Sequence, residues 1–266
     1  MSRMDLGQGA DITVLLAHYR CERWVDRAIA SILRQAGVRL QMVFADDASG
    51  TPEVIERLSE RWRDARTTWF AASRNAGQFR IYNRLLPYVR SPFVAFQDAD
   101  DWSEPQRLEM LMEAMQKGGW DLLGSHLQRD GRVVAPPADV NRALRWRCRG
   151  GVIFGATTLW RTAFLRQIRG FDGSTRFGGD TDAAYRAVFA GRVGNLPRVL
   201  YHATVREDSL SSLPETGFGS PARRAYRARI RRRFYRNRLR QFTGGLSDDA
   251  LAPPANDLDF ELMEIG

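Results

Sequence analysis

Three carboxylates, Asp98, Asp100 and Asp101, stand directly after the apolar run PFVAFQ at residues 92–97. Like charges this close repel one another, so a cation or hydrogen-bond donors must compensate them. Carboxylates together with substrate phosphates are the usual ligands of Mg²⁺ and Mn²⁺. The pattern predicts a metal site here. The alternative is that SEPQ at residues 103–106 is a helix-capping box, which would explain the polar residues without a metal.

Short apolar runs alternate with amphipathic segments in the part of the chain that leads to these carboxylates. The apolar runs are typical of buried strands, and the segments between them carry apolar residues at helical spacing. This alternation predicts an α/β fold with a mostly parallel sheet flanked by helices. Strands are expected at 11–17, 39–47, 67–72 and 92–97, and helices at 22–37, 51–62 and 78–89.

Polar residues stand at the carboxyl ends of the predicted strands. The first strand ends beside Ala17 and Tyr19. The second ends in Asp46 and Asp47, and the fourth ends in Asp98. Ligands of parallel sheets collect beyond these strand ends. The residues are therefore predicted to share one edge of the sheet, where a metal would offset the carboxylates.

The composition indicates one catalytic domain with a tail. A chain of 266 residues with 44% hydrophobic content can bury one core. No run approaches the roughly 20 apolar residues of a membrane span, and MSRMDLGQGA at the start lacks the apolar core of a signal peptide. A cytoplasmic protein is expected. Cys21 and Cys148 lack metal-ligand spacing and are expected to be reduced.

The net charge of +9 is carried almost entirely by arginine, since Lys117 is the only lysine. Genome composition accounts for such an excess. A nucleic-acid-binding protein would use the basic residues 221–242 to contact phosphates. That reading leaves the strand-end carboxylates unexplained, so no nucleic-acid partner is expected.

Four motifs, in order, resemble those of the family 2 glycosyltransferases, over about residues 12–210. ITVLLAHYR resembles a strand that leads into a Pro-Thr-Tyr-Asn loop, of which only Tyr19 is retained. MVFADDAS resembles a Val-Asp-Asp-Gly-Ser element, NAGQFRIYNRLL an Asn-x-Gly stretch, and AFQDADDW a DXD element. The resemblance implies the GT-A fold of nucleotide-sugar enzymes. It assigns nucleotide binding to Ala17, Tyr19, Asp46, Asp47, Asn75, Gly77, Asn83 and Asp98.

The DXD element implies a metal as well as phosphate contacts. Asp98 and Asp100 take the role of ligands to Mn²⁺ or Mg²⁺, and Asp98 also lies toward the diphosphate. Asp101 and Trp102 follow and are candidates to face the acceptor, although Trp102 could instead cover the next helix. The closing segment LYHATVREDSLS resembles one that folds over the diphosphate, which adds Arg206 and Ser209 to the nucleotide contacts.

The late segment RGFDGSTRFGGDTDAAYR resembles the part of the family that supplies a catalytic base. Asp180 falls at the base position, while Gly179 stands where the family often has a second acid. A carboxylate opposite the leaving diphosphate can accept the proton of the attacking hydroxyl. Asp182 competes for this role, although a first-turn acid is also favoured by the helix dipole. His202 is a further metal-ligand candidate that could equally be a core residue.

The resemblance implies an inverting, metal-dependent hexosyl- or N-acetylhexosaminyltransferase. The donor is a nucleoside diphosphate sugar, most often linked to UDP in this family. The acceptor is a hydroxyl of a glycan or a lipid-linked molecule, in cell-surface polysaccharide biosynthesis. The alternatives are an inactive nucleotide-sugar-binding protein and a sugar-1-phosphate nucleotidyltransferase. The latter needs a glycine-rich phosphate loop, and AHYRCERW contains no glycine.

Residues 221–242 predict a basic helix with an imperfect apolar stripe, capped by Ser220 and Pro221. The stripe could lie on a membrane surface, with arginines attracted to anionic lipids. Alternatively, it packs on the catalytic domain while the arginines are solvated or pair with the acidic tail. The stripe comprises Tyr226, Ile230, Phe234, Leu239 and Phe242, and the tail acids are Asp257, Asp259, Glu261 and Glu264.

The expected domain organisation combines these segments. Residues 1–10 are an N-terminal extension and residues 11–212 the GT-A catalytic domain. The resemblance divides that domain into a nucleotide-binding half, 11–101, and an acceptor half, 102–212. Residues 213–266 hold the basic helix and the acidic tail.

Overall fold

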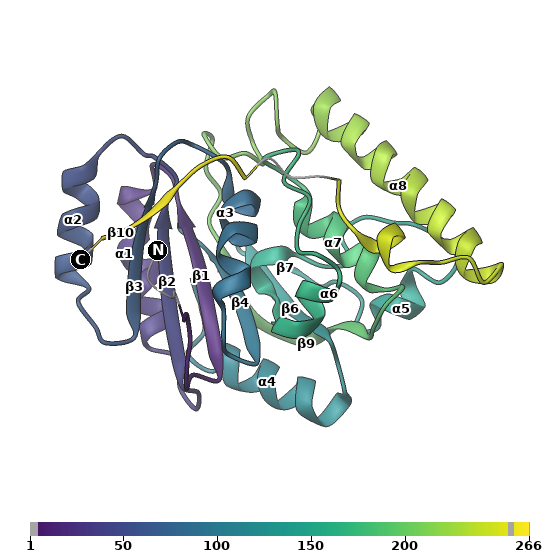
Figure 1. Ribbon diagram of the computed structural model, residues 1–266, viewed down its shortest axis with the longest axis horizontal. Helices are drawn as coiled ribbons and strands as arrows, with labels where there is room; N and C mark the ends of the chain where they lie inside the picture. The colour runs from purple at the N-terminus through teal and green to yellow at the C-terminus, as the bar shows by residue number, and fades with distance from the viewer. Residues whose placement is uncertain (1–4, 255–257, 266) are drawn as a thin grey trace.

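One ten-stranded sheet runs through residues 5–254 and 258–265, which are the residues that the computed structural model describes (Figure 1). Its strand order is β10-β3-β2-β1-β4-β8-β6-β9-β5, and β7 pairs with β6. The sheet has helices on both faces, as the alternation of segments predicts.

The first half of the sheet is parallel. β2, β1 and β4 are hydrogen-bonded neighbours that run in one direction, and β3 continues them beyond β2. Their carboxyl ends therefore meet at one edge, which confirms the predicted convergence of strand ends. The elements are β1 (Ile12–His18), α1 (Glu22–Leu33), β2 (Leu40–Asp46), α2 (Pro52–Arg61), β3 (Thr67–Ala72), α3 (Gln78–Leu85), η1 (Leu86–Tyr88) and β4 (Phe93–Asp98).

The second half of the sheet is mixed, because it adds antiparallel strands to the parallel ones. β8 is antiparallel to both of its neighbours, β4 and β6, whereas β6 and β9 are parallel. The elements are β5 (Trp102–Ser103), α4 (Arg107–Gly118), β6 (Leu122–Arg129), β7 (Arg132–Val134), α5 (Val140–Ala143), η2 (Gly155–Thr157), β8 (Leu159–Arg161), α6 (Thr162–Gln167), α7 (Gly179–Ala187) and β9 (Val193–Ala203).

The two faces of the sheet bury separate hydrophobic clusters. Val14 and Leu16 of β1 point to the face covered by α1, α2 and α4. Leu15 points to the opposite face, with α3, α6, α7 and α8. This alternation follows from the two-residue period of a strand. Both faces of the parallel half are therefore closed to solvent.

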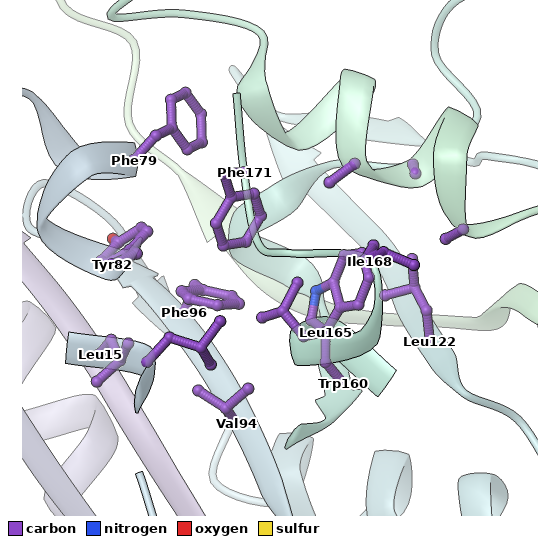
Figure 2. Close-up of a cluster of buried hydrophobic side chains, with 14 of the residues drawn as sticks. Leu15, Phe79, Tyr82, Val94, Phe96, Leu122, Trp160, Leu165, Ile168 and Phe171 are labelled. Atoms are coloured by element: carbon purple, nitrogen blue, oxygen red, sulfur yellow. The ribbon is translucent and has the colours of Figure 1, made fainter. Parts of the chain in front are cut away.

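Aromatic side chains join the two halves of the sheet (Figure 2). The ring centroid of Phe96 on β4 lies 4.7 Å from that of Tyr82 on α3 and 5.1 Å from that of Phe171. Phe171 also contacts Trp160 of β8 edge-on, at 6.1 Å. Aromatic pairs in such orientations add to the stability given by their burial. This cluster fixes the segment that leads to α7 against the end of β4.

The C-terminal part comprises α8 (Pro221–Phe242), η3 (Asp248–Leu251) and β10 (Leu262–Ile265), which pairs with β3. Tyr226, Ile230 and Phe234 of α8 are buried in the core shared with α7. Leu239 and Phe242 are each 65% exposed. The stripe thus packs on the catalytic domain over its first part only, and the domain boundaries given above stay a prediction.

The arginines on the buried side of α8 pair with the catalytic domain. Arg229 lies 2.9 Å from the Asp172 carboxylate, and Arg233 contacts Asp182. Of the tail acids, Glu264 lies in β10, and Asp257 falls outside the described residues. Ion pairs with the catalytic domain thus anchor this side of α8.

The packing of α8 predicts a contrast between two phenylalanines of the same helix. Phe234→Ala should lower the free energy of unfolding by about 3 to 5 kcal/mol, because it leaves a cavity in the core. The exposed Phe242→Ala serves as the control and should change it by less than about 0.5 kcal/mol. Urea unfolding of both variants measures the difference. Equal effects would contradict the packing.

Candidate active site

A cavity of about 1190 Å³ opens where the strands of the parallel half end. Its lining includes Ala17 and Tyr19 at the end of β1, Asp47 after β2, and the three carboxylates at the end of β4. The start of α7, the segment 206–213 and one side of α8 complete the walls. The lining residues carry most of the functional groups that the sequence predicts.

The carboxylates after β4 lie in an environment that disfavours their charges. Burial and the charges of Asp101 and Asp100 raise the pKa of Asp98 well above its ordinary value. Burial and Asp100 likewise raise the pKa of Asp101 to about 7, although Asp101 accepts a hydrogen bond of 2.7 Å from the Thr204 amide. Asp100 forms an ion pair of 2.7 Å with Arg206. The negative charge of the three carboxylates is thus only partly neutralised by neighbouring groups.

A fully buried arginine lies beneath this cluster and was not predicted from the sequence. The Arg107 guanidinium donates to Gln97 Oε1, Ser103 Oγ and the carbonyls of Phe96 and Ala156, at 2.6–3.2 Å. Burial lowers its pKa to about 10, while the nearby charges of Asp98 and Asp101 act in the opposite direction. Arg107 holds the end of β4 in place and adds positive charge below the carboxylates.

The capping-box alternative for residues 103–106 is wrong. Helix α4 begins at Arg107 after Gln106, without a side-chain cap. Ser103 instead lies in β5 and donates to Gln97. The acidic residues before it therefore need another explanation.

The two acidic residues at the end of β2, Asp46 and Asp47, have different contacts. Asp47 lines the cavity and accepts the backbone N–H groups of Ala76 and Gly77 at 2.6 and 2.8 Å, at the start of α3. Burial raises its pKa to about 6. Asp46 instead accepts from His18 Nδ1 at 2.8 Å. The structure thus brings Asp47 together with Gly77 and the neighbouring Asn75 at the cavity.

Asp180 lies in the first turn of α7 and lines the cavity. Its Oδ2 accepts a hydrogen bond of 3.0 Å from the Gly155 amide. Asp182 is buried and forms an ion pair of 2.7 Å with Arg186, so it does not compete for the cavity. A Cβ at Gly179 would stand 2.6 Å from the Asp172 carbonyl oxygen. This contact explains why the position has no second acid.

Arg206 and Ser209 both line the cavity, on the segment after β9. Arg206 pairs with Asp100, and its guanidinium lies 4.7 Å from the ring centroid of Trp24. The Ser209 hydroxyl donates to the Arg206 carbonyl at 3.0 Å. This segment thus covers the DXD carboxylates from outside.

Three predicted site residues are absent from the lining of this cavity within the described chain, namely Asp46, Asn83 and Trp102. Asn83 donates to the Phe171 carbonyl and accepts from its amide, at 2.8 and 2.9 Å. Trp102 stacks on His202 with ring centroids 3.7 Å apart. The nitrogens of His202 contact Gln128 and Glu104. These side chains stabilise the frame around the site.

The described residues include no group of three or more His, Cys, Asp or Glu side chains placed to hold a metal ion. Likewise, none of their helices is both long enough and apolar enough to cross a membrane.

Comparison with known proteins identifies the family. The model of the family described as "Glycosyl transferase family 2" matches residues 13–190. The chain is a family 2 glycosyltransferase. The nucleotidyltransferase alternative is therefore set aside.

Relatives of this glycosyltransferase match different lengths of the chain. EpsE of Bacillus subtilis is 27% identical over 216 residues, which are 77% of this chain and 76% of EpsE. An uncharacterized glycosyltransferase of Nostoc sp. is 34% identical over 107 residues, which are 40% of this chain and 33% of that protein. The succinoglycan biosynthesis protein ExoO of Rhizobium meliloti is 30% identical over 129 residues, 47% of this chain and 36% of ExoO.

Solved structures confirm the GT-A fold of this glycosyltransferase. Residues 1–349 of TarS from S. aureus, in complex with UDP-GlcNAc, align with a TM-score of 0.65 at 21% identity, over 87% of this chain and 73% of that one. The mannosyltransferase PcManGT of Pyrobaculum calidifontis, in complex with GDP-Man and Mn²⁺, aligns with a TM-score of 0.61 at 18% identity, over 91% and 69%.

The raised pKa values of Asp47, Asp98 and Asp101 predict how stability depends on pH. A carboxyl group whose pKa is higher in the folded protein stabilises the fold while it is protonated. This contribution is complete below the ordinary pKa of 3.8 and is lost as pH rises through about 6 and about 7. The free energy of unfolding of the ligand-free protein should therefore fall from about pH 4 to about pH 8.

Urea unfolding across this range measures the effect. Asp101→Asn removes one of the three carboxyl groups with a raised pKa, so the free energy of unfolding should depend less steeply on pH in this variant. Stability that rises with pH over the same range would contradict the predicted shifts.

Proposed function

We propose that the protein is a metal-dependent, inverting glycosyltransferase that moves a sugar from a UDP-sugar to an acceptor hydroxyl in glycan biosynthesis. The observation that carries this proposal is the convergence of Asp98 and Asp100 with Asp180 on one cavity. The fold is shared with TarS, which is solved with UDP and UDP-GlcNAc, and this supports a nucleotide-sugar donor.

The donor would lie along the ends of β1, β2 and β4. Ala17, Tyr19, Asp47, Asn75 and Gly77 line this part of the cavity, where the Asp47 carboxylate is fixed by two backbone amides. We assign the nucleoside to these residues. Asp46 acts indirectly, because it fixes the ring of His18 at the end of β1.

Asp98 and Asp100 fit a divalent cation of the Mg²⁺ or Mn²⁺ class. Carboxylate oxygens are the ligands such ions prefer, and Mg²⁺ sites with one or two carboxylates draw further ligands from substrate phosphates. Burial raises the pKa of Asp98, and so do the neighbouring carboxylates, whose charge a cation would offset. A bound metal would stabilise the charge of the departing diphosphate. PcManGT, a protein of the same fold, is solved with Mn²⁺.

The protein's own residues would then position and deprotonate the acceptor. Arg206 and Ser209 would cover the diphosphate from the segment after β9. Asp180 is held by the Gly155 amide through one oxygen and would accept the hydroxyl proton of the acceptor as the glycosidic bond forms. Asp101 lines the same cavity and stays a proposed acceptor contact.

A donor-turnover assay tests this function. The wild-type protein should release UDP from UDP-GlcNAc or UDP-glucose in the presence of Mn²⁺ and lose this activity with EDTA. Asp180→Asn should reduce transfer by about 100-fold or more, because an amide cannot accept the proton, while Kd for UDP changes little. Asp130→Asn on the β6–β7 turn is the matched control.

Three results would contradict parts of the proposal. Absence of Mn²⁺-dependent UDP binding would contradict the donor site. UDP binding without turnover of any donor would favour the inactive sugar-nucleotide-binding protein. Normal transfer by Asp180→Asn would move the base elsewhere.

We further propose that the enzyme acts in the cytoplasm and contacts the membrane surface peripherally through residues 221–242. The apolar stripe as a whole cannot contact a membrane, because its first part is buried in the protein. The exposed end of the helix can contact a membrane. There, Phe242 and Trp146 stack with ring centroids 5.8 Å apart and are 65% and 70% exposed. Arg145 and Arg147 flank Trp146 in the sequence, and Arg240 lies two residues before Phe242. Aromatic residues flanked by cations are typical of membrane-surface sites.

Cosedimentation with phosphatidylglycerol vesicles tests this contact. The double variant Trp146→Ser, Phe242→Ser should lose most of the vesicle-bound fraction. Val133→Ser with Met263→Ser removes two other exposed apolar side chains and should not. Equal binding by all three proteins, or none by the wild type, would exclude this patch.

A further inference from the structure

Two groups of arginines on α8 have different surroundings. Arg229 and Arg233, on the side that packs against the domain, pair with Asp172 and Asp182. Arg224, Arg227 and Arg231 line the cavity. Within the described chain, these three have no ion pair with a carboxylate. Helix α8 itself contains no acidic residue.

The hydrogen bonds of the cavity-facing group leave its charges uncompensated. Arg224 and Arg227 donate to the carbonyls of Gly219 and Phe218, which are neutral acceptors. Arg231 makes no hydrogen bond within the described residues. All three side chains are exposed. Arg149 adds another cation to the lining, from the loop before η2, and it too has no ion pair in the part of the chain that the structure describes.

The spacing of these residues sets out a basic track. Arg223, Arg227 and Arg231 recur at intervals of four, so they lie on one side of the helix. At about 1.5 Å per residue, the track is about 12 Å long. Its inner end lies beside the start of α7, because Arg223 and Asp180 line the same cavity and Tyr226 of α8 donates to the Gly178 carbonyl at 3.2 Å. Arg223 itself is partly buried and contacts the rings of Phe177 and Phe218.

The donor does not account for this track. The proposed sites for its nucleoside and diphosphate lie along the ends of β1, β2 and β4, where Arg206 already pairs with Asp100. The arginines of α8 lie on the Asp180 side of the cavity, from which the acceptor hydroxyl must approach. Guanidinium groups match phosphate and carboxylate oxygens in a bidentate geometry.

We propose that the acceptor is anionic, with phosphate or carboxylate groups that bind Arg149, Arg227 and Arg231 while its hydroxyl reaches Asp180. The length of the track suits an acceptor with two or more such groups in succession. This inference rests on the proposed glycosyltransferase function and adds the chemical class of the acceptor.

Titration calorimetry with the full chain, UDP and Mn²⁺ at saturation, tests the track apart from the donor site. The anionic probe is a short glycerol phosphate oligomer, and the neutral probe is maltohexaose. Wild type should bind the anionic probe at least about tenfold more tightly, and raised salt should weaken this binding. Arg227→Glu with Arg231→Glu should weaken it by at least about tenfold.

The same helix supplies the matched control. Arg232 and Arg236 are exposed and do not line the cavity in the described chain, so Arg232→Glu with Arg236→Glu makes the same change in charge outside the track. This variant should bind within about twofold of wild type, since distant exposed charges are screened. Melting curves of both variants check that each is folded.

A vesicle-binding experiment tests whether the anionic group of the acceptor belongs to a lipid or to a glycan. Phosphatidic acid and phosphatidylcholine vesicles replace the soluble probes. Retention on phosphatidic acid that depends on Arg227 and Arg231 would assign the anion to a lipid phosphate. Dependence seen only with the soluble oligomer would assign it to the glycan.

The outcomes separate this inference from the function on which it rests. Equal affinity for both soluble probes and both vesicles, or equal losses in the two double variants, would overturn the anionic acceptor. Failure of the wild type to release UDP from any UDP-sugar would overturn the proposed function, whatever the calorimetry shows.

Discussion

The repulsion among three carboxylates at the end of β4 is the constraint on which the site depends. Asp98, Asp100 and Asp101 face one cavity, where burial and then their mutual charges raise the pKa of Asp98 and Asp101. Arg107 beneath them and Arg206 above Asp100 offset this charge only in part. The fold thus holds like charges close together at the end of β4, at the cost of some stability, and this is the charge that the proposed cation would offset.

Positive charge in this protein has two distinct structural uses. Where an arginine is buried, as in Arg107 or in the pair of Arg186 with Asp182, it ties segments together through several hydrogen bonds. Where it faces the cavity from α8, it has no acidic partner among the described residues. A composition rich in arginine hides this difference, because the sequence gives the same residue for both uses.

The sequence predicts the parallel half of the fold well, since strand and helix periods are local properties of the chain. It also predicts that Asp47 and Asp98 share one edge of the sheet, because the carboxyl ends of parallel strands must meet. Asp180 comes from the family resemblance instead, and it lines the same cavity. The sequence does not predict the role of a residue when that role depends on which side chain or backbone group it contacts. Asn83 and Trp102 face Phe171 and His202 rather than the cavity, and no pattern marks those contacts. The antiparallel β8 and the buried Arg107 also lack a local signal.

The most direct test of the account is an anomalous difference map from crystals grown with UDP and Mn²⁺. The account predicts one manganese peak within coordination distance of the Asp100 or Asp98 carboxylate, about 2 to 2.5 Å, and bridged to the UDP phosphates. The Asp180 carboxylate should lie on the opposite side of the empty sugar site. A nucleotide bound elsewhere, or bound here with no manganese at these carboxylates, would contradict the central claim.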